Sequence, residues 1–332
     1  MISRRAFLHG LTAAGVASSL GLGAERAAAA PPPETTTLRL LLTPSLCVAP
    51  QYVAEDLLKS EGFVDVKYLP TDVGGITKAL ASGAADFALH FVGPSVIEID
   101  TGVPVVMLAG VHVGCFELFG TDRVRAIRDL KGKTVAVTQL GLTQHVFLAS
   151  MVAHVGLDPR KDINFVAHPP AEAKRLLAEG RVDAYLGFPP DPQELREKKV
   201  GHVVVNSAID RPWSQYFCCM ATTNREFLRK NPVATKRALR AILKAADLCA
   251  FEPQRAAQAL IDKKLTTRLD YARQIMTDVP YNKWREYAPD DTVRFYALRL
   301  HEAGMIKSSP QKILAQGTDW RFLNELKKEL KG

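Results

Sequence analysis

A short segment that occurs twice constrains the fold of this chain more than any other feature. Residues 80–87 read LASGAADF, and residues 177–184 read LAEGRVDA. Each copy has a glycine suited to a left-handed helix C-cap, followed by an aspartate that opens a short apolar strand. Both strands lead to a phenylalanine and a proline, at residues 91–94 and 188–190. The repeat therefore predicts two lobes of similar construction.

Apolar, strand-like segments alternate with amphipathic segments of helix length along most of the chain. This alternation is typical of βαβ units and a largely parallel sheet. The sequence predicts strands at residues 38–42, 64–68, 86–89, 105–108, 133–137, 163–166, 182–186 and 217–223. It predicts helices at residues 52–59, 76–81, 95–100, 143–154 and 171–178, and a helical end at 224–229, 234–251, 253–263, 270–277 and 292–303. The expected fold class is α/β, with mixed, mostly parallel sheets.

The N-terminal residues have the form of a targeting segment and are set aside from the fold argument. Arg4 and Arg5 precede an apolar run, residues 11–22, that is too short and too rich in small residues to span a bilayer. We expect a twin-arginine-type signal peptide at residues 1–29, cleaved near Ala29, and a linker at residues 30–37. The sequence thus predicts export to the periplasm.

About 300 residues follow this segment, which is more than one hydrophobic core usually serves. We expect lobe 1 to consist of residues 38–118 and 218–332, and lobe 2 of residues 119–217. The chain would cross between the lobes near residues 115–122 and 213–217. The helical C-terminal region would pack on lobe 1.

Composition, charge and cysteine spacing narrow the class further. Apolar residues make up 47% of the chain, and the net charge of +8 is spread over mixed charges, so we expect a monomeric globular protein that does not bind nucleic acid. Five irregularly spaced cysteines cannot form a disulfide scaffold, although one bridge is possible. Cys218 and Cys219 would point to opposite faces of a strand and have no CxxC or HxxxH spacing. We therefore expect buried, apolar cysteines and no metal or cofactor.

Four segments carry a resemblance to a known family. They are residues 80–87, LKGKTVAV at 130–137, residues 177–186 and FLRKNP at 227–232. In these segments the chain resembles the nitrate/sulfonate/taurine and thiamine-precursor (pyrimidine) solute-binding family of ABC transporters. Membership would imply a type II periplasmic-binding fold and closure of two lobes on a small solute. It would also imply a permease and an ATPase of the inner membrane as partners.

In open α/β sheets, ligands bind beyond the carboxyl ends of the strands, which nominates five loops. These are residues 43–50, 71–75 and 90–95 of the first lobe, and residues 138–145 and 187–191 of the second. Phe91 and Phe188 would form symmetrical apolar walls, and Gly74 would offer backbone N–H groups at a helix start. The other ligand-binding candidates are Ser45, Asp72, Ser95, Gln139, Thr143, Gln144 and Asp191. Helix capping is the alternative role for residues such as Asp72 and Asp191, and either phenylalanine could instead lie in the core.

The nominated loops contain no arginine or lysine. Because sulfonate and nitrate sites often use such cations, a neutral or heteroaromatic solute is favoured. The chain has no nucleophile elbow, HExxH motif or phosphate loop, so we expect a binding subunit of an ABC importer without enzymatic activity. Two alternatives stay open. One is an enzyme similar to the cytosolic branch that makes the thiamine pyrimidine, which carries a cysteine-rich cluster near residues 217–220, and the other is a periplasmic ligand sensor.

Overall fold

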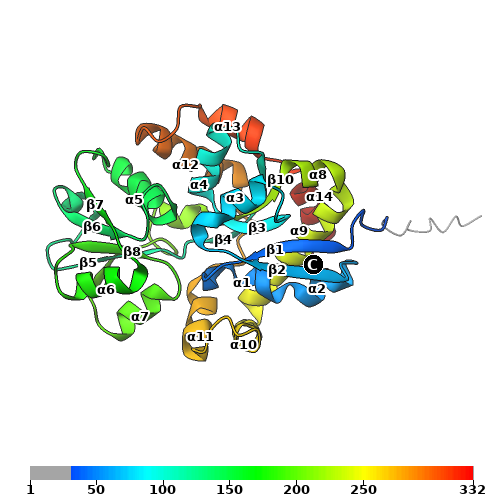
Figure 1. Cartoon of the computed structure of the whole chain (residues 1–332), viewed down its shortest axis with the longest axis horizontal. Coiled ribbons are helices and arrows are strands. Elements are labelled where there is room, and N and C mark those ends of the chain that lie inside the picture. The colour runs from blue at the N-terminus through cyan, green and yellow to red at the C-terminus, as the bar shows by residue number, and fades with distance from the viewer. Residues whose placement is uncertain (1–30, 332) are drawn as a thin grey trace, which may run out of the picture. The chain divides into compact units, whose positions relative to one another are not determined.

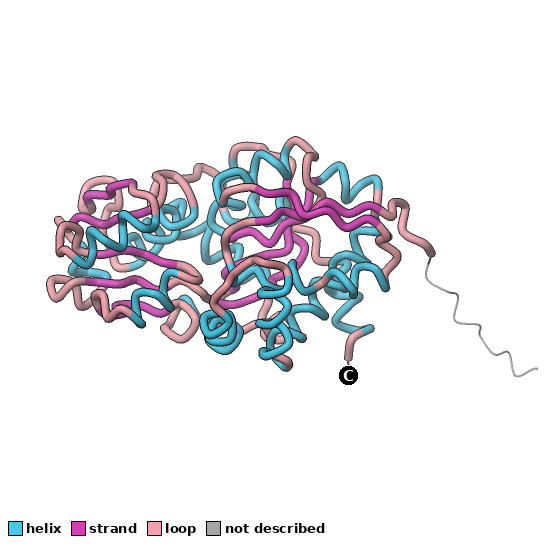
Figure 2. Tube along the Cα trace, turned by 60° about the horizontal axis from the view of Figure 1, so that its bottom comes forward, coloured by secondary structure: helices cyan, strands magenta, loops and turns pink. Residues whose placement is uncertain are grey.

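The computed structural model describes residues 31–331, and the expected signal peptide at residues 1–29 lies outside them. The chain from Pro32 onward forms one compact unit that contains two five-stranded sheets (Figure 1). The tube view separates the two groups of strands (Figure 2). We call the part built around the first sheet lobe 1 and the part built around the second sheet lobe 2. Among the described helices, none has the length and apolar character needed to span a membrane.

The first sheet is built from two separate parts of the chain, residues 37–113 and residues 217–224. Its strands are β1 (Thr37–Leu42), β2 (Asp65–Pro70), β3 (Phe87–Phe91), β4 (Val105–Val113) and β10 (Phe217–Asn224). Their order across the sheet is β2-β1-β3-β10-β4. Only β10 runs against its neighbours, so four of the five strands point the same way.

The second sheet repeats this plan with the intervening residues. Its strands are β5 (Glu117–Gly120), β6 (Thr134–Val137), β7 (Asn164–Ala167), β8 (Ala184–Gly187) and β9 (His202–Asn206), in the order β7-β6-β8-β5-β9. Here β5 is the antiparallel strand. In each sheet the reversed strand is the first one after the chain crosses from the other sheet. The expected mixed, mostly parallel sheets are confirmed, whereas the predicted lobe boundaries near residues 118 and 217 stay a prediction.

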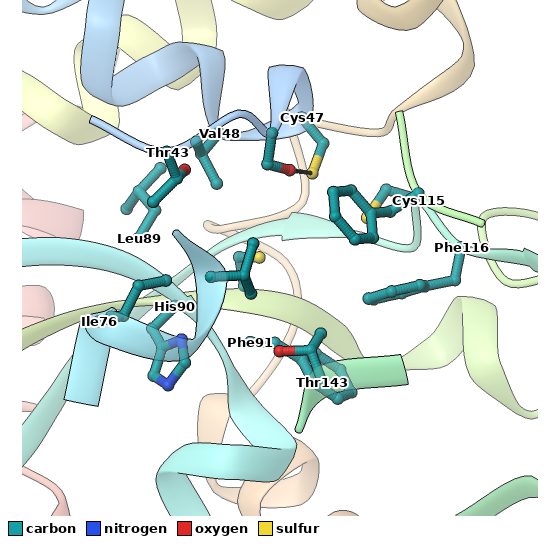
Figure 3. A pocket seen from close by; sticks show the side chains of 14 residues that line it. Thr43, Cys47, Val48, Ile76, Leu89, His90, Phe91, Cys115, Phe116 and Thr143 are labelled. Atoms are coloured by element: carbon teal, nitrogen blue, oxygen red, sulfur yellow. Dashed lines mark hydrogen bonds between the residues drawn. The ribbon is translucent and has the colours of Figure 1, made fainter. Parts of the chain in front are cut away.

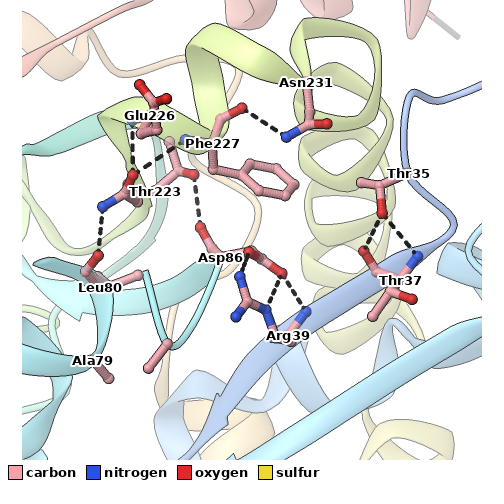
Figure 4. Close-up of polar contacts among 12 residues, drawn as sticks. Thr35, Thr37, Arg39, Ala79, Leu80, Asp86, Thr223, Glu226, Phe227 and Asn231 are labelled. Atoms are coloured by element: carbon pink, nitrogen blue, oxygen red, sulfur yellow. Dashed lines mark hydrogen bonds and ion pairs between the residues drawn. The ribbon is translucent and has the colours of Figure 1, made fainter. Parts of the chain in front are cut away.

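The repeated segment has the local structure that its sequence predicts. Gly83 and Gly180 end their helices with φ of +70° and +68°. The aspartate that follows each glycine fixes the start of the next strand. Asp86 accepts hydrogen bonds from the backbone N–H and the guanidinium of Arg39 on β1 (Figure 4). Asp183 accepts one from the backbone N–H of Thr134 on β6.

Helices cover both sheets. In lobe 1 they are η1 (Leu46–Val48), α1 (Ala49–Val53), α2 (Glu55–Ser60), η2 (Val73–Gly75), α3 (Ile76–Ala81) and α4 (Val92–Asp100). In lobe 2 they are η3 (Ile127–Leu130), α5 (Thr143–His154), α6 (Pro170–Ala178), α7 (Asp191–Glu197) and η4 (Trp213–Gln215). The C-terminal helices are α8 (Arg225–Lys230), α9 (Pro232–Phe251), α10 (Pro253–Asp262), α11 (Leu269–Asp278), α12 (Pro289–Glu302), α13 (Pro310–Gly317) and α14 (Arg321–Glu329).

Local capping explains where the C-terminal helices begin. The Asn224 side chain accepts hydrogen bonds from the N–H groups of Glu226 and Phe227 at the start of α8. Pro232 occupies the first turn of α9, and the next two N–H groups donate to the carboxylate of Glu34. Part of the predicted linker is therefore bound to lobe 1.

The expectation that the helical end packs on lobe 1 holds for most of its helices. Helix α9 packs on α1 and α2, and α13 packs on α4. Helix α12, however, contacts both α4 and α5. Its Tyr296 ring lies 5.4 Å from that of Phe91 in lobe 1 and 5.9 Å from that of Phe147 in lobe 2. The C-terminal region thus contacts both lobes.

Candidate functional site

A pocket with about 370 Å³ of empty space, part of it open to solvent, lies where the two lobes meet. Lobe 1 lines it with Thr43 and Ser45 from the loop that follows β1 and with His90 near the end of β3. Lobe 2 contributes Thr143 and Phe188. Figure 3 shows Thr43 and Leu89 on one side of the pocket and Cys115 and Phe116 on the other. The pocket therefore occupies the strand ends at which ligands bind in open α/β sheets.

Aromatic rings form one wall of this pocket, but they are not symmetrical as predicted. Phe91 is only 4% exposed, and its ring packs against Phe116 and Phe147 at centroid distances of 5.2 and 5.3 Å. Phe188 is half-buried and touches the cluster through Phe116, at 5.9 Å. Phe91 is thus largely a core residue with one edge at the pocket, because α5 and α12 enclose it. Phe188 is the more accessible aromatic surface.

Hydroxyl groups on the loop after β1 are held in place by Tyr52. The Tyr52 hydroxyl donates to the Thr43 carbonyl at 2.8 Å and accepts from the Thr43 N–H at 3.0 Å. Burial raises the pKa of Tyr52 to about 12, so the phenol stays protonated. Two residues further along, the Ser45 hydroxyl lies 3.1 Å from the Cys47 sulfur. The loop therefore presents neutral hydrogen-bonding groups in a fixed conformation.

The buried pair of His90 and Glu98 was not predicted from the sequence. His90 lines the pocket and is 2% exposed, and its Nε2 atom lies 3.1 Å from Oε1 of Glu98. The Thr77 hydroxyl donates to the same carboxylate oxygen. Burial raises the pKa of Glu98, but His90 and Thr77 lower it more, so the net pKa lies below its ordinary value. The Nδ1 atom of His90 is buried without a hydrogen-bond partner.

Four cysteines and one histidine gather beside the pocket, and three of the cysteines, Cys47, Cys115 and Cys219, line it. Cys47 is in η1, His112 and Cys115 are at and just after the end of β4, and Cys218 and Cys219 begin β10. All five side chains are buried, as predicted for the cysteines. The argument that Cys218 and Cys219 point to opposite faces is wrong. The register of β10 shifts on both sides of Cys219, and the two sulfurs lie 3.9 Å apart.

Charge in this cluster is distributed unevenly. Hydrogen bonds from Cys115 and Cys219 lower the pKa of the Cys47 thiol despite its burial. Burial lowers the pKa of His112, but the neighbouring Cys47 and Cys218 sulfurs raise it to a net value of about 9.

Several predicted site residues support the loops instead of lining the pocket. Asp72 accepts a hydrogen bond from Gly75 N at 2.7 Å and caps η2, which is the alternative role expected for it. Ser95 is fully buried, and its hydroxyl donates to the Phe91 carbonyl at 3.3 Å. Gln144 is also buried and donates to the Leu186 carbonyl at 3.3 Å. Each hydrogen-bonds to the backbone, and Gln144 also accepts from the Thr138 hydroxyl, so a ligand has less access to these polar atoms.

Asp191 is not among the residues that line the pocket. Its carboxylate accepts from Lys174 Nζ at 2.7 Å and from the Tyr185 hydroxyl at 2.5 Å, within lobe 2. It does not cap α7, because it is already the first residue of that helix. These partners hold Asp191 under the second sheet and outside the pocket lining.

Gly74 and Gln139 lie at the contact between the lobes. A Cβ atom at Gly74 would meet Leu142 Cδ1 at 2.8 Å and Gln139 Oε1 at 3.6 Å. Elsewhere the Leu46 N–H donates to the Pro189 carbonyl at 3.4 Å. Both contacts join lobe 1 to lobe 2 beside the pocket. Of the ten predicted residues, Ser45, Phe91, Thr143 and Phe188 line the pocket itself.

Residues 31–262 match the NMT1-like family. The chain belongs to this family. A solved structure of the nitrate-binding protein NrtA from Synechocystis matches with a TM-score of 0.72 and 19% identity, covering 91% of this chain and 90% of that protein. The alkanesulfonate-binding protein SsuA from Xanthomonas axonopodis, bound to MOPS, matches with a TM-score of 0.67 and 17% identity, covering 86% and 99%. These similarities confirm the two-lobed periplasmic-binding fold.

Relatives found by sequence similarity correct one expectation. A 4-amino-5-hydroxymethyl-2-methylpyrimidine phosphate synthase of Saccharomyces cerevisiae is 27% identical over 257 residues, which are 71% of this chain and 72% of the relative. We had expected a protein without enzymatic activity because familiar catalytic motifs are missing. That expectation is wrong, since relatives over most of the chain are named as enzymes. The absence of familiar catalytic motifs is weak evidence against enzymatic activity, because one fold can host many functions.

Proposed function

We propose that this NMT1-like protein binds a small, neutral heteroaromatic solute of the pyrimidine class between its two lobes. We further propose that it serves as the periplasmic binding subunit of an ABC importer, with a permease and an ATPase as partners. The observation that carries the proposal is the chemistry of the pocket lining. Among the described residues that line it, aromatic rings, hydroxyls and thiols surround His90, and there is no arginine or lysine.

An anionic ligand would find little compensation for its lost hydration in such a pocket. Nitrate and sulfonate are commonly held by guanidinium or ammonium groups. The imidazole of His90 is already paired with the Glu98 carboxylate. A flat neutral ring can instead pack on Phe188 while Thr43, Ser45 and Thr143 hydrogen-bond to its nitrogen atoms and substituents.

Closure of the lobes links ligand binding to a conformational change of the protein. Lining residues come from both lobes, so a ligand contacts all of them only when the lobes are together. The Gly74–Leu142 and Leu46–Pro189 contacts join the two lobes directly and support a closed arrangement. A bound ring would add to these contacts and shift the equilibrium towards the closed form.

Catalysis on the same ring is a second candidate function. The relatives named as pyrimidine phosphate synthases favour it. Within the pocket, the buried His90–Glu98 pair could transfer a proton, since an imidazole beside a carboxylate is a common acid–base arrangement. Both candidates share the ligand class and differ in whether the ring is altered. A periplasmic sensor would bind the same solute, and a genomic neighbourhood with permease and ATPase genes would favour the importer.

Thermal-shift and calorimetric titrations test the proposal directly. We expect 4-amino-5-hydroxymethyl-2-methylpyrimidine to raise the melting temperature, and nitrate and alkanesulfonates to leave it unchanged. Phe188→Ala should weaken pyrimidine binding by roughly 2- to 13-fold, which corresponds to about 0.5–1.5 kcal/mol for an aromatic contact. Phe251→Ala is the matched control because Phe251 is 70% exposed and outside the pocket. Binding of nitrate or sulfonate alone would overturn the proposal, and mass-spectrometric detection of an altered ring would favour catalysis.

A further inference from the structure

The cluster of Cys47, His112, Cys115, Cys218 and Cys219 has the composition of a metal site. Its members come from three separate parts of the chain, and none is more than 6% exposed. The ligand atoms of Cys47, His112 and Cys115 lie within 4.8 Å of one another, as do those of His112, Cys218 and Cys219. His112 is therefore shared by both groups. Thiolate and imidazole together are the ligands of thiophilic ions such as Zn²⁺ and Cu⁺.

Distances between the sulfurs fit the edge of a coordination tetrahedron. Zn–S bonds of about 2.3 Å place two sulfur ligands roughly 3.8 Å apart. The Cys115 and Cys218 sulfurs lie 3.5 Å apart, and those of Cys218 and Cys219 lie 3.9 Å apart. Both separations need only small side-chain adjustments to reach that value. Folding alone has thus brought sulfurs from β10 and from the segment after β4 to ligand spacing.

His112 is oriented as a metal ligand would be. Its Nδ1 atom lies 3.0 Å from the Gly114 carbonyl, to which it can donate its proton. That tautomer leaves the lone pair of Nε2 free, and Nε2 is fully buried without a hydrogen-bond partner. Metal-binding histidines commonly donate the other ring N–H to a backbone carbonyl in this way. A buried, unpartnered nitrogen beside sulfurs is costly unless something binds it.

Two simpler explanations account for fewer features of the cluster. Buried cysteines can act as small apolar residues, as Cys249 does on α9. That role gives no reason for a buried imidazole among the sulfurs. A Cys115–Cys218 disulfide would use the 3.5 Å pair but would leave His112 Nε2 unpartnered. An ion satisfies the nitrogen and the sulfurs together.

We propose that this cluster binds one thiophilic metal ion, Zn²⁺ or Cu⁺, through His112 Nε2 and three of the four neighbouring sulfurs. The thiols would release their protons to solvent on binding, and no electron transfer is involved. Cys115 lies between β4 and β5, where the chain leaves the first sheet, and Cys218 is the second residue of β10, where it returns, so the ion would tie these two points together. Cys47, Cys115 and Cys219 also line the ring-binding pocket, but metal binding does not depend on the ring-binding proposal and goes beyond it.

Metal titration of the reduced, folded chain under argon tests the inference. We expect about one equivalent of Zn²⁺ to bind, and Co²⁺ to give sulfur-to-cobalt charge-transfer bands together with the visible bands of a tetrahedral site. Cys218→Ser and His112→Gln should each weaken binding more than about 100-fold, since loss of an outer-shell partner alone costs about 10–100-fold. Cys249→Ser is the matched control and should bind like the parent, because that thiol is buried away from the cluster.

The spectrum of the unaltered chain keeps the inference testable if a variant fails to fold. Absence of Zn²⁺, Co²⁺ and Cu⁺ binding by the reduced parent chain would overturn it. Equal affinity in the parent and in folded Cys218→Ser and His112→Gln would do the same. None of these readouts needs a pyrimidine, so failure of the metal site and failure of the ring-binding proposal can be told apart.

Discussion

Asp86 and Asp183 occupy equivalent places in the two lobes, and each carboxylate accepts a hydrogen bond from a backbone N–H of the adjacent parallel strand. The distances are 2.7 Å to Arg39 N and 2.9 Å to Thr134 N. Each aspartate also pairs with an arginine, Arg39 or Arg123, at 2.6 Å. The carboxylate thus joins the start of one strand to its neighbour and holds the two strands in register.

Loss of either carboxylate should destabilise the fold, and Asp86 should matter more. Its side chain is 4% exposed, compared with 14% for Asp183. We expect Asp86→Ala to lower the free energy of unfolding by about 2–3 kcal/mol and Asp183→Ala by about 1 kcal/mol, because a buried N–H loses its acceptor. Urea unfolding measures both, with Asp56→Ala, at a 95% exposed side chain, as the control without effect.

The parent chain should lose its stability advantage over the Asp183→Ala variant at low pH. Burial raises the pKa of Asp183, but the Thr134 N–H and Arg123 lower it more, so the folded-state pKa lies below the ordinary value. Stability from this carboxylate is present above the unfolded pKa and is lost as the pH falls through the folded pKa. Parent and Asp183→Ala should therefore converge in stability below about pH 4. A constant difference down to pH 2 would contradict this explanation.

The sequence predicted the fold better than it predicted the site, for physical reasons. Residues 76–81 and 143–154 were predicted as helices with the observed bounds, because their apolar spacing and flanking residues are local signals. β5 was missed because the charged side chain of Glu117, which is buried, interrupts the apolar pattern of this strand. The cysteine cluster was missed because its members are remote in sequence and meet only where the chain crosses between sheets. A bulge at Cys219 also broke the strand alternation on which the prediction relied.

The stability of the fold should depend on Arg196, because its charge compensates that of a buried carboxylate in lobe 2. It donates to Glu117 on β5 and, at 2.6 Å, to Asp278 on α11. Burial raises the pKa of Glu117 and outweighs the opposite effect of Arg196. We expect Arg196→Met to cost about 3 kcal/mol at pH 8, since it leaves an unpaired buried charge. Chemical unfolding at pH 5 and pH 8 measures this cost.

The direction in which the cost of Arg196→Met changes with pH shows whether the unpaired charge or lost side-chain packing destabilises the variant. With its folded pKa raised, Glu117 favours folding below its unfolded pKa, and that stability is lost as the pH rises through the folded pKa. Arg196→Met should therefore be less damaging at pH 5 than at pH 8. The double variant Arg196→Met, Glu117→Gln should recover much of the stability at pH 8. An equal cost at both pH values would indicate that only side-chain packing was lost.

Export should depend on the arginine pair near the N-terminus. Arg4 and Arg5 precede an apolar segment as in twin-arginine signals. We expect replacement of both by lysine to leave uncleaved precursor in the cytoplasm, measured by fractionation and immunoblotting of a bacterial host. Replacement of Arg26 alone, which lies after the apolar segment, should not affect export. Normal export of the double-lysine chain would indicate the general secretory route.

Closure of the lobes should be sensitive to the size of residue 74. A Cβ atom there would approach Leu142 Cδ1 to 2.8 Å, but a leucine methyl can move away from a single added carbon. Gly74→Ala should therefore weaken ligand binding only slightly. Gly74→Val adds two further carbons and should cost about 1–3 kcal/mol in the closed form, as overpacking does. Because the open form lacks this contact, the cost should appear as a roughly 5- to 150-fold loss of affinity with little change in the stability of the ligand-free protein.

Leu142→Ala tests whether the contact between residue 74 and Leu142 causes this loss of affinity. In the Gly74→Val background it removes the opposing methyl groups and should restore most of the affinity, whereas alone it should have a small effect. Isothermal titration with the pyrimidine gives the coupling between the two substitutions, and small-angle scattering reports whether the ligand still closes the lobes. Additive effects of the two substitutions would show that the Gly74–Leu142 contact does not control closure. A large coupling would show that binding energy is limited by how closely the loop at residues 71–75 can approach the loop at 138–142.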